Sequence, residues 1–365
     1  MDFSEFLVPV SIDLRMENYS RFQIGGKIRF EADEEIDEDS IVLIATNELQ
    51  QFNHLEEEDF DLDPVRRHLY HLSHSNWYKK IYDLGTIYRG ATFEDSCFAL
   101  HQIIRKIHSK GATLLLCGGT QALHYILYKA IQKDLLRVGS IDIKIDIDAA
   151  FEGLNAENHI TKMILDEDQR LLEFKSIGSQ LPYVAKEEYD ILEQLNFEDL
   201  RLGKFQEDFK KAEPLIRDLQ LLSVDMNVMQ YSSFKSSVIC TSNGLNEREI
   251  CKLMNYAGMS SDLKVMHISN FVNASLEDNN LLAEMLWYFI DARNNLKLDT
   301  EVDTYRVQSG DEEIVFIHSK LSDRWWIEAH IDGRISRIPC NESDYTDAMN
   351  GEIPEKWLNF YKKFY

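Results

Sequence analysis

The chain has 365 residues and a formal net charge of −24, from 39 Lys and Arg against 63 Asp and Glu. Its 44% of hydrophobic residues is enough for a sizeable core, which excludes a wholly disordered chain. The acidic balance argues against binding to nucleic acid or to an anionic membrane surface, because the phosphate groups would be repelled.

The sequence carries no sign of membrane insertion or secretion. No segment approaches the roughly 18 unbroken apolar residues of a membrane span, and the segment MDFSEFLVPV lacks the basic region of a signal peptide. The five cysteines are scattered and contain no Cys-x-x-Cys pair, which is typical of reduced thiols. We therefore expect a cytoplasmic protein without membrane insertion.

Strands and helices are expected to alternate along most of the chain. Residues 24–34 and the apolar run 41–46 are predicted strands, and Asp63-Pro64 opens a helix that extends to Leu72. The further predicted strands are 81–88, 112–117, 141–147, 221–224 and 263–268, and the further predicted helices are 93–110, 121–133, 244–256 and 281–294. This alternation predicts an α/β protein whose mostly parallel sheet is covered on both faces.

The C-terminal segment has a different pattern. From Thr304 it consists of short β segments with Gly-containing turns, and it ends in a short helix near 354–365. We predict an α/β domain over residues 1–300 and a β-rich extension over 301–365 that packs on it. The pair Trp325-Trp326 is expected to attach the extension to the core.

Several common catalytic motifs are missing from the sequence. The segment CGGTQ at 117–121 has two glycines but lacks the lysine of a P-loop, and no G-x-G-x-x-G follows a predicted strand. No two histidines have the H-x-x-x-H or H-E-x-x-H spacing that binds zinc. These observations argue against nucleotide binding and against a zinc hydrolase of that type.

Three predicted strand ends form a set of polar loops, at residues 116–121 (LCGGTQ), 147–152 (IDAAFE) and 223–230 (SVDMNVMQ). Together they resemble the ureohydrolase superfamily of arginase, agmatinase and formimidoylglutamase. In that family the loops read Gly-Gly-[Asp/Gly]-His, Asp-Ala-His-x-Asp and Ser-x-Asp-x-Asp-x-x-Asp. The segments DPVRRHLYHL at 63–72 and Asp83-Leu84-Gly85 are similar to further family segments, and the C-terminal segment resembles that of a bacterial formimidoylglutamase-like subgroup.

This resemblance implies a three-layer α/β/α arginase-like fold, two manganese ions on the three loops, and hydrolysis of linear amidines. The positions that would then hold the metals are, in chain order, Gln121, Asp148, Ala150, Glu152, Asp225 and Asn227. No histidine stands at these positions. Two divalent ions about 3.5–4 Å apart need several bridging carboxylates. We therefore expect that the dinuclear site is largely lost, that no cofactor is bound, and that the protein is a non-catalytic pseudoenzyme with a binding or assembly role.

Several alternatives stay open. Asp148, Glu152 and Asp225 are possible ligands of a single Mg²⁺, Ca²⁺ or Mn²⁺, which would make the protein a C–N hydrolase of formimidoyl- or guanidino-amino acids. By the resemblance, His159 and Asn270 are candidates for the substrate pocket, although without a metal nearby His159 is expected at the surface. A protein partner, a homo-oligomer and a small-molecule ligand are all compatible with the sequence.

Overall fold

The computed structural model of the chain describes residues 6–30, 36–49, 60–87, 89–147, 153–272, 275–309, 312–331 and 334–364. Its main sheet has ten strands: β1 (Leu7–Val8), β2 (Ile28–Arg29), β3 (Ile41–Thr46), β4 (Ile81–Ile87), β5 (Thr113–Cys117), β6 (Leu136–Ile141), β7 (Leu171–Ile177), β8 (Glu198–Leu200), β9 (Leu221–Asp225) and β10 (Val265–Ser269). The strand order is β1-β4-β3-β5-β10-β9-β6-β7-β8, and β2 also pairs with β4. Of these pairings, only that of β1 with β4 is antiparallel.

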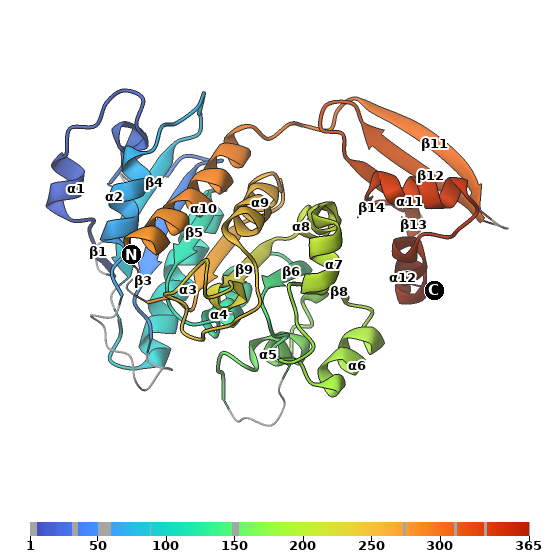
Figure 1. Cartoon of the computed structure of the whole chain (residues 1–365), viewed down its shortest axis with the longest axis horizontal. Helices are drawn as coiled ribbons and strands as arrows, with labels where there is room; N and C mark the ends of the chain where they lie inside the picture. Colours follow the sequence, from blue (N-terminus) through green and yellow to red (C-terminus); the bar gives the residue numbers. More distant parts are fainter. Residues whose placement is uncertain are drawn as a thin grey trace.

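Helices cover both faces of this sheet (Figure 1). One face carries α2 (Asp63–His71), α7 (Leu202–Glu207), α8 (Ala212–Ile216), α9 (Glu247–Gly258) and α10 (Leu276–Asn294). The other carries α3 (Phe93–Ser109), α4 (Leu123–Ala130), α5 (His159–Ile164) and α6 (Lys186–Gln194). The smaller elements are α1 (Ile12–Met16) and the 3₁₀ turns η2 (Ile24–Lys27), η4 (Phe209–Lys211) and η5 (Met226–Val228). The predicted three-layer α/β/α architecture is confirmed.

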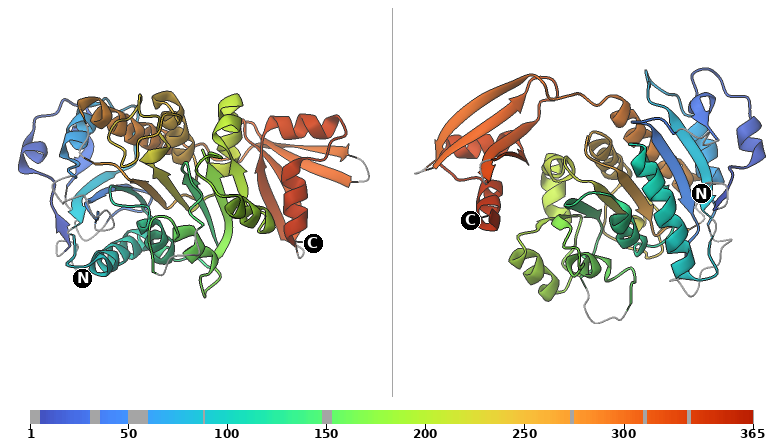
Figure 2. Two further views of the ribbon diagram at one scale, coloured as in Figure 1. Left: turned by 60° about the horizontal axis from the view of Figure 1, so that its bottom comes forward. Right: turned by 180° about the vertical axis from the view of Figure 1, so that it is seen from behind.

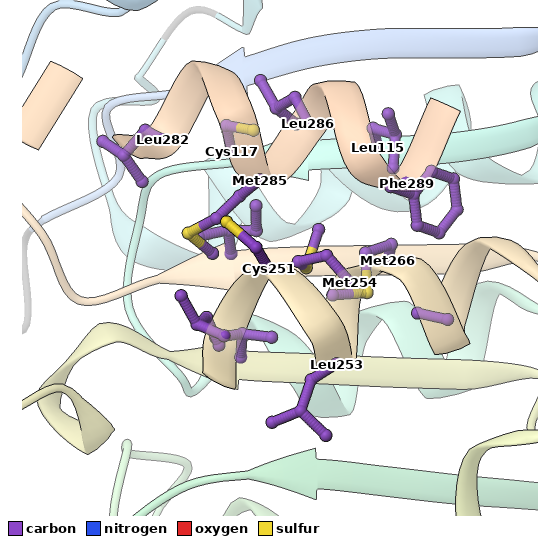
Figure 3. Packing of buried hydrophobic residues seen from close by; sticks show 14 of the residues in the cluster. Leu115, Cys117, Cys251, Leu253, Met254, Met266, Leu282, Met285, Leu286 and Phe289 are labelled. Atoms are coloured by element: carbon purple, nitrogen blue, oxygen red, sulfur yellow. The ribbon is translucent and has the colours of Figure 1, made fainter. Parts of the chain in front are cut away.

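The core lies in two apolar layers because each central strand is buried on both faces. In β3, Leu43 packs into the layer beneath α9 and α10, whereas Ile44 packs into the layer beneath α3 and α4, as the alternation of side chains along a strand requires. Figure 3 shows the first layer, where methionine, leucine and cysteine side chains fill the space between the helices and the sheet. No described helix combines the length and the apolar character needed to cross a membrane.

A buried ion pair joins α2 to β4. The Arg66 guanidinium donates to both carboxylate oxygens of Asp83, at 2.9 and 3.1 Å, and to the Gly85 carbonyl oxygen at 2.7 Å. The Tyr70 hydroxyl donates to the same carboxylate at 2.6 Å. Gly85 has φ +93°, and a Cβ atom there would lie 2.0 Å from the Val8 carbonyl oxygen, so only glycine fits. The two segments that resemble family segments, 63–72 and 83–85, therefore form one structural unit.

Two strand predictions are wrong in position. Ile24–Lys27 is a 3₁₀ turn, and only Ile28–Arg29 of the predicted strand 24–34 pairs in the sheet, while 31–35 lie outside the described residues. The strand predicted at 141–147 is instead β6, which ends at Ile141. The alternation Ile-Asp-Ile-Lys-Ile-Asp imitates a half-buried strand, but β6 ends because β7, with which it pairs, also ends there, at Ile177.

The C-terminal segment forms a second, antiparallel sheet in the order β11 (Val302–Ser309), β12 (Glu312–Ser319), β13 (Trp325–Ile331) and β14 (Arg334–Cys340). Two helices follow, α11 (Glu342–Met349) and α12 (Glu355–Phe364). The Tyr345 ring of α11 stacks on Trp325 at 4.9 Å between centroids, so the unit has its own aromatic core. The predicted β-rich extension is confirmed. Its independence as a domain stays a prediction.

The extension lies beside the β7–β8 end of the main sheet, as the views in Figures 1 and 2 agree, and Arg217 attaches it to α8. The Arg217 guanidinium donates to the carbonyl oxygens of Trp325 at 2.5 Å and Cys340 at 3.2 Å. It lies 4.7 Å from the Trp326 ring centroid and pairs with Glu213. Of the two tryptophans expected to attach the extension, Trp326 contacts the core with its ring through Arg217, whereas the Trp325 ring packs within the extension.

We predict that Arg217→Met lowers the free energy of unfolding by about 3–5 kcal/mol, because the Glu213 carboxylate and two buried carbonyl groups lose their partner. Arg306→Met is the matched control. Arg306 pairs with Glu313 at an exposed site, where an ion pair contributes about 0–1 kcal/mol. Urea unfolding of the two variants measures the difference, and equal stabilities would contradict the anchoring role of Arg217.

Candidate functional site

The carboxyl ends of β5, β10, β9 and β6 meet at one edge of the sheet, where parallel α/β proteins bind their ligands. A cavity of about 310 Å³ opens there. Its charged and amide lining includes Asp142, Lys144, Asp146, Asp225, Asn227 and Asn270.

Gln121, which follows β5, connects the ends of three neighbouring strands. Its side-chain oxygen accepts hydrogen bonds from the hydroxyl groups of Ser223 at 2.8 Å and Ser269 at 2.6 Å. Its side-chain nitrogen donates to the Ser140 hydroxyl at 3.2 Å. These serines belong to β9, β10 and β6, so the amide of Gln121 makes three of its four possible hydrogen bonds within the protein.

The loop after β9 is held by amide contacts. The Asp225 carboxylate accepts from the Asn227 backbone N–H at 2.7 Å and from the Asn270 side-chain N–H at 2.6 Å. The Asn227 side-chain oxygen accepts in turn from the Ile239 N–H at 2.7 Å. Asn270 has φ +60°, a left-handed conformation that asparagine tolerates better than most residues. Asp225, Asn227 and Asn270 thus lie together at the strand ends.

Asp148, Ala150 and Glu152 lie outside the described residues. At the end of β6 the structure instead presents Asp142 and Asp146, with Lys144 between them. The sequence analysis missed these three residues because it placed them inside a strand. Their segment, DIKID, retains both aspartates of the family spacing Asp-Ala-His-x-Asp, whereas DAAFE at 148–152 retains only one. Comparing these two segments with the family spacing could therefore have identified Asp142, Lys144 and Asp146 from the sequence.

The pocket carboxylates are costly to ionise. Burial raises the pKa of Asp225 to about 6, despite the hydrogen bonds from Asn227 and Asn270. Burial, followed by the charges of Asp225 and Asp146, raises the pKa of Asp142 well above its usual value. Among the described residues, one Asp142 oxygen and the Asn270 side-chain oxygen have no hydrogen-bond partner. The pocket therefore offers buried acceptor oxygens and carboxyl groups that resist ionisation.

Lys144 supplies positive charge to this pocket. Its ammonium lies 2.7 Å from a Glu157 carboxylate oxygen, and its backbone N–H donates to Asp142 at 3.0 Å. Burial opposes its charge, but the hydrogen bond to Glu157 and the charges of Glu157, Asp146 and Asp142 outweigh burial and raise the Lys144 pKa. Lys144 is thus an ammonium at neutral pH.

Three buried histidines lie together near the pocket. The ring centroids of His124 and His159 are 5.2 Å apart. If these two rings were protonated, their positive charges would repel each other and the charge of a protonated His267. His159 is fully buried, which corrects the expected surface position, and its Nδ1 lies 2.9 Å from the Ala156 carbonyl oxygen and 3.7 Å from Asp146. Burial lowers the pKa values of His159 and His267 to about 4, so both are neutral.

No protein-family model and no curated protein sequence matches this chain. Solved structures do resemble it. The formimidoylglutamase from Bacillus subtilis subsp. subtilis str. 168 is 16% identical with a TM-score of 0.67, covering 77% of this chain and 96% of its own. The formiminoglutamase of Trypanosoma cruzi with Mn2+2 is 15% identical with a TM-score of 0.63, covering 71% and 94%.

The proclavaminate amidino hydrolase from Streptomyces clavuligerus is also similar, with 16% identity, a TM-score of 0.61, and coverage of 80% of this chain and 98% of its own. The chain therefore has the fold of formiminoglutamases and other arginase-superfamily proteins. At these identities the likeness establishes the fold, and the residues of the pocket must carry any argument about chemistry.

The described residues fit poorly to a pair of metal ions. Of the positions that the resemblance assigns to metal ligands, Gln121 has its amide bound by three serines and Asn227 accepts from Ile239, and the Lys144 ammonium adds a positive charge to the pocket lining. Three carboxylates, Asp142, Asp146 and Asp225, remain. Within the described ranges, no group of three or more His, Cys, Asp or Glu has an arrangement that could hold a metal ion.

We predict that Asp142→Asn stabilises the protein. A carboxyl group whose folded pKa is raised takes up protons more readily in the folded state, so its ionisation costs stability as the pH rises above the unfolded value near 3.9. Asparagine keeps the acceptor for the Lys144 N–H and removes the charge. We expect the free energy of unfolding at pH 8 to rise by about 1 kcal/mol or more, and to rise less at pH 5. The exposed aspartate Asp190 on α6 gives the control, Asp190→Asn, which should change neither value.

We also predict a loss of stability in acid from the buried histidines. Because their folded pKa is near 4 and the unfolded value near 6.5, the unfolded chain takes up protons between these pH values and the folded chain does not. Stability should therefore fall as the pH drops from 6.5 to 4. His267→Gln, which can still donate to the Gly118 carbonyl oxygen, should reduce this fall in urea titrations, whereas His330→Gln at an exposed position should not. An unchanged pH dependence in His267→Gln would refute this account.

Proposed function

We propose that this chain is a non-catalytic protein of arginase fold that binds a small cationic ligand in the pocket at the strand ends. The observation that carries the proposal is the Gln121 network. Where the family's first metal-binding histidine stands, this chain has an amide whose oxygen and nitrogen are held by Ser140, Ser223 and Ser269. Without a metal-activated hydroxide, an amidine has no nucleophile for its hydrolysis near neutral pH.

The chemistry of the lining supports a ligand with N–H donors. Asp142 and Asn270 each leave a buried oxygen without a partner among the described residues, and such a group costs about 1–3 kcal/mol. Ammonium or amidinium groups donate several hydrogen bonds and add positive charge to that of Lys144, which is outnumbered by the acidic groups of the lining. The cavity of about 310 Å³ is of the size that holds a small molecule.

A second candidate function is hydrolysis with a single divalent cation. The presence of Asp142, Asp146 and Asp225 in one pocket lining favours it, because carboxylate oxygens are the ligands of Mg²⁺, Ca²⁺ and Mn²⁺, although these three side chains are not arranged around a metal position in this structure. By the names of the similar proteins, the substrates would be formimidoyl- or guanidino-amino acids. The set Asp148, Glu152 and Asp225 remains a prediction, as do a cytoplasmic location, a protein partner and a homo-oligomer.

The two functions predict different results for the purified protein. We expect no ammonia or urea release from formimidoyl- and guanidino-amino acids with Mn²⁺ present, and stabilisation by some amine or guanidino compounds in a thermal-shift screen. A ligand at 100 times its dissociation constant stabilises by about 2.7 kcal/mol. Asp225→Asn, which removes one pocket charge, should weaken that shift. Manganese-dependent turnover at about 1–1000 per second, lost in Asp225→Asn, would instead establish the hydrolase.

A further inference from the structure

The carboxylate pocket has one cationic side chain among the described residues that line it, and that residue is Lys144. Its ammonium is 2.7 Å from Glu157 at the mouth of the pocket. Lys144 also lines the same cavity as Asp142, Asp146 and Asp225, and its backbone N–H donates to the Asp142 carboxylate at 3.0 Å. Lys144 therefore lies between an exposed carboxylate and a buried group of carboxylates.

The position of Lys144 in the chain is as informative as its contacts. In the spacing Asp142-Ile143-Lys144-Ile145-Asp146, lysine stands where the family's loop Asp-Ala-His-x-Asp has its histidine. A histidine nitrogen donates a lone pair to a metal ion, whereas a lysine ammonium has none to donate and brings a charge of its own. Compared with the family's loop, this chain thus has a positively charged side chain at the position of a metal-binding histidine.

Buried carboxylates require a counter-charge. Asp142, Asp146 and Asp225 are each less than 9% exposed, and removing such groups from water without a partner costs several kcal/mol for each ion. A metal ion meets this need in a metalloenzyme. In this chain the Gln121 and Asn227 amides are held by other groups, so Lys144 is left to meet it.

We propose that the Lys144 ammonium is the resident counter-cation of this pocket and takes the electrostatic place of a metal ion. The inference rests on the proposed function, since a pocket that worked with metal ions would repel this ammonium. It implies that the wild-type pocket is assembled without metal. It also implies that removing the lysine charge creates a site that depends on a divalent cation.

The test compares Lys144→Met with Lys129→Met by thermal unfolding at pH 7.5, in EDTA and with 1 mM Mn²⁺. The two lysines are matched, since each side chain is 31% exposed and each pairs with a carboxylate, but Lys129 pairs with Asp166 and Asp168, which are not part of the pocket lining. We expect Lys144→Met to melt about 3–6 °C below the wild type in EDTA. Mn²⁺ should restore at least half of that loss and should leave the wild type and Lys129→Met unchanged.

Two further variants keep the test decisive. Lys144→Arg preserves the charge and should behave as the wild type with and without Mn²⁺. In the double variant Asp142→Asn/Lys144→Met one negative and one positive charge are removed together, so it should melt within about 2 °C of the wild type and show a weaker response to Mn²⁺. If Lys144→Met is insoluble while the double variant folds, the charge of Lys144 is what the pocket requires.

Other outcomes would overturn the inference. If Lys144→Met melts like the wild type in EDTA, or if the double variant is as unstable as Lys144→Met, the lysine does not act through its charge. A wild-type melting temperature that rises with Mn²⁺ as much as that of Lys144→Met would show that the ammonium does not replace a metal. Manganese-dependent hydrolysis by the wild type would overturn the proposed function as well, whereas the first two results leave that proposal standing.

Discussion

The structure at the strand ends depends on one side-chain amide. Gln121 binds serines from β6, β9 and β10, and these hydroxyl groups are buried, so each needs a partner. The hydroxyl groups of Ser223 and Ser269 donate to the Gln121 oxygen, and the Ser140 hydroxyl accepts from the Gln121 nitrogen. An amide side chain can do both, because its oxygen accepts two hydrogen bonds while its nitrogen donates. A neutral imidazole, with one donor and one acceptor nitrogen, could not satisfy all three. Glutamine, unlike histidine, can therefore join these three strand ends through its side chain.

Buried charged side chains such as Arg66 and Lys175 have partners of opposite charge, whereas most of those in the pocket have none among the described residues. Arg66 and Asp83 are buried with their hydrogen bonds matched, and the fully buried Lys175 ammonium is surrounded by Asp218, Glu173 and Glu198. In the pocket, by contrast, four acidic residues, Asp142, Asp146, Glu157 and Asp225, share the lining with one lysine. Sites that retain such a cost are functional more often than structural, which is why we propose a binding role for this edge of the sheet.

The C-terminal extension is attached by polar contacts rather than by a shared apolar core. Arg217 reaches the backbone of β13 and β14, Arg324 pairs with Glu213 at 3.0 Å, and the extension keeps its own cluster around Phe316 and Trp325. The extension lies beside β8, the last strand in the sheet order (Figure 1), where a covered edge is protected from pairing with other chains.

The sequence by itself determined the layered fold and part of the site. Short apolar runs such as 41–46 and 113–117 indicate strands buried on both faces, and the amphipathic helices between them are expected to cover the sheet. Gln121, Asp225, Asn227 and Asn270 could be located near the strand ends because the segments that contain them follow such runs and resemble the family's loops. Tertiary structure alone decided where β6 ends, because Ile-Asp-Ile-Lys-Ile-Asp has the period of a strand whether or not a neighbour is present to pair with it. The end of β6 in turn places Asp142, Lys144 and Asp146 in the pocket. This placement and the burial of His159 could not be predicted from periodicity alone, because they depend on contacts between segments that are distant in the sequence.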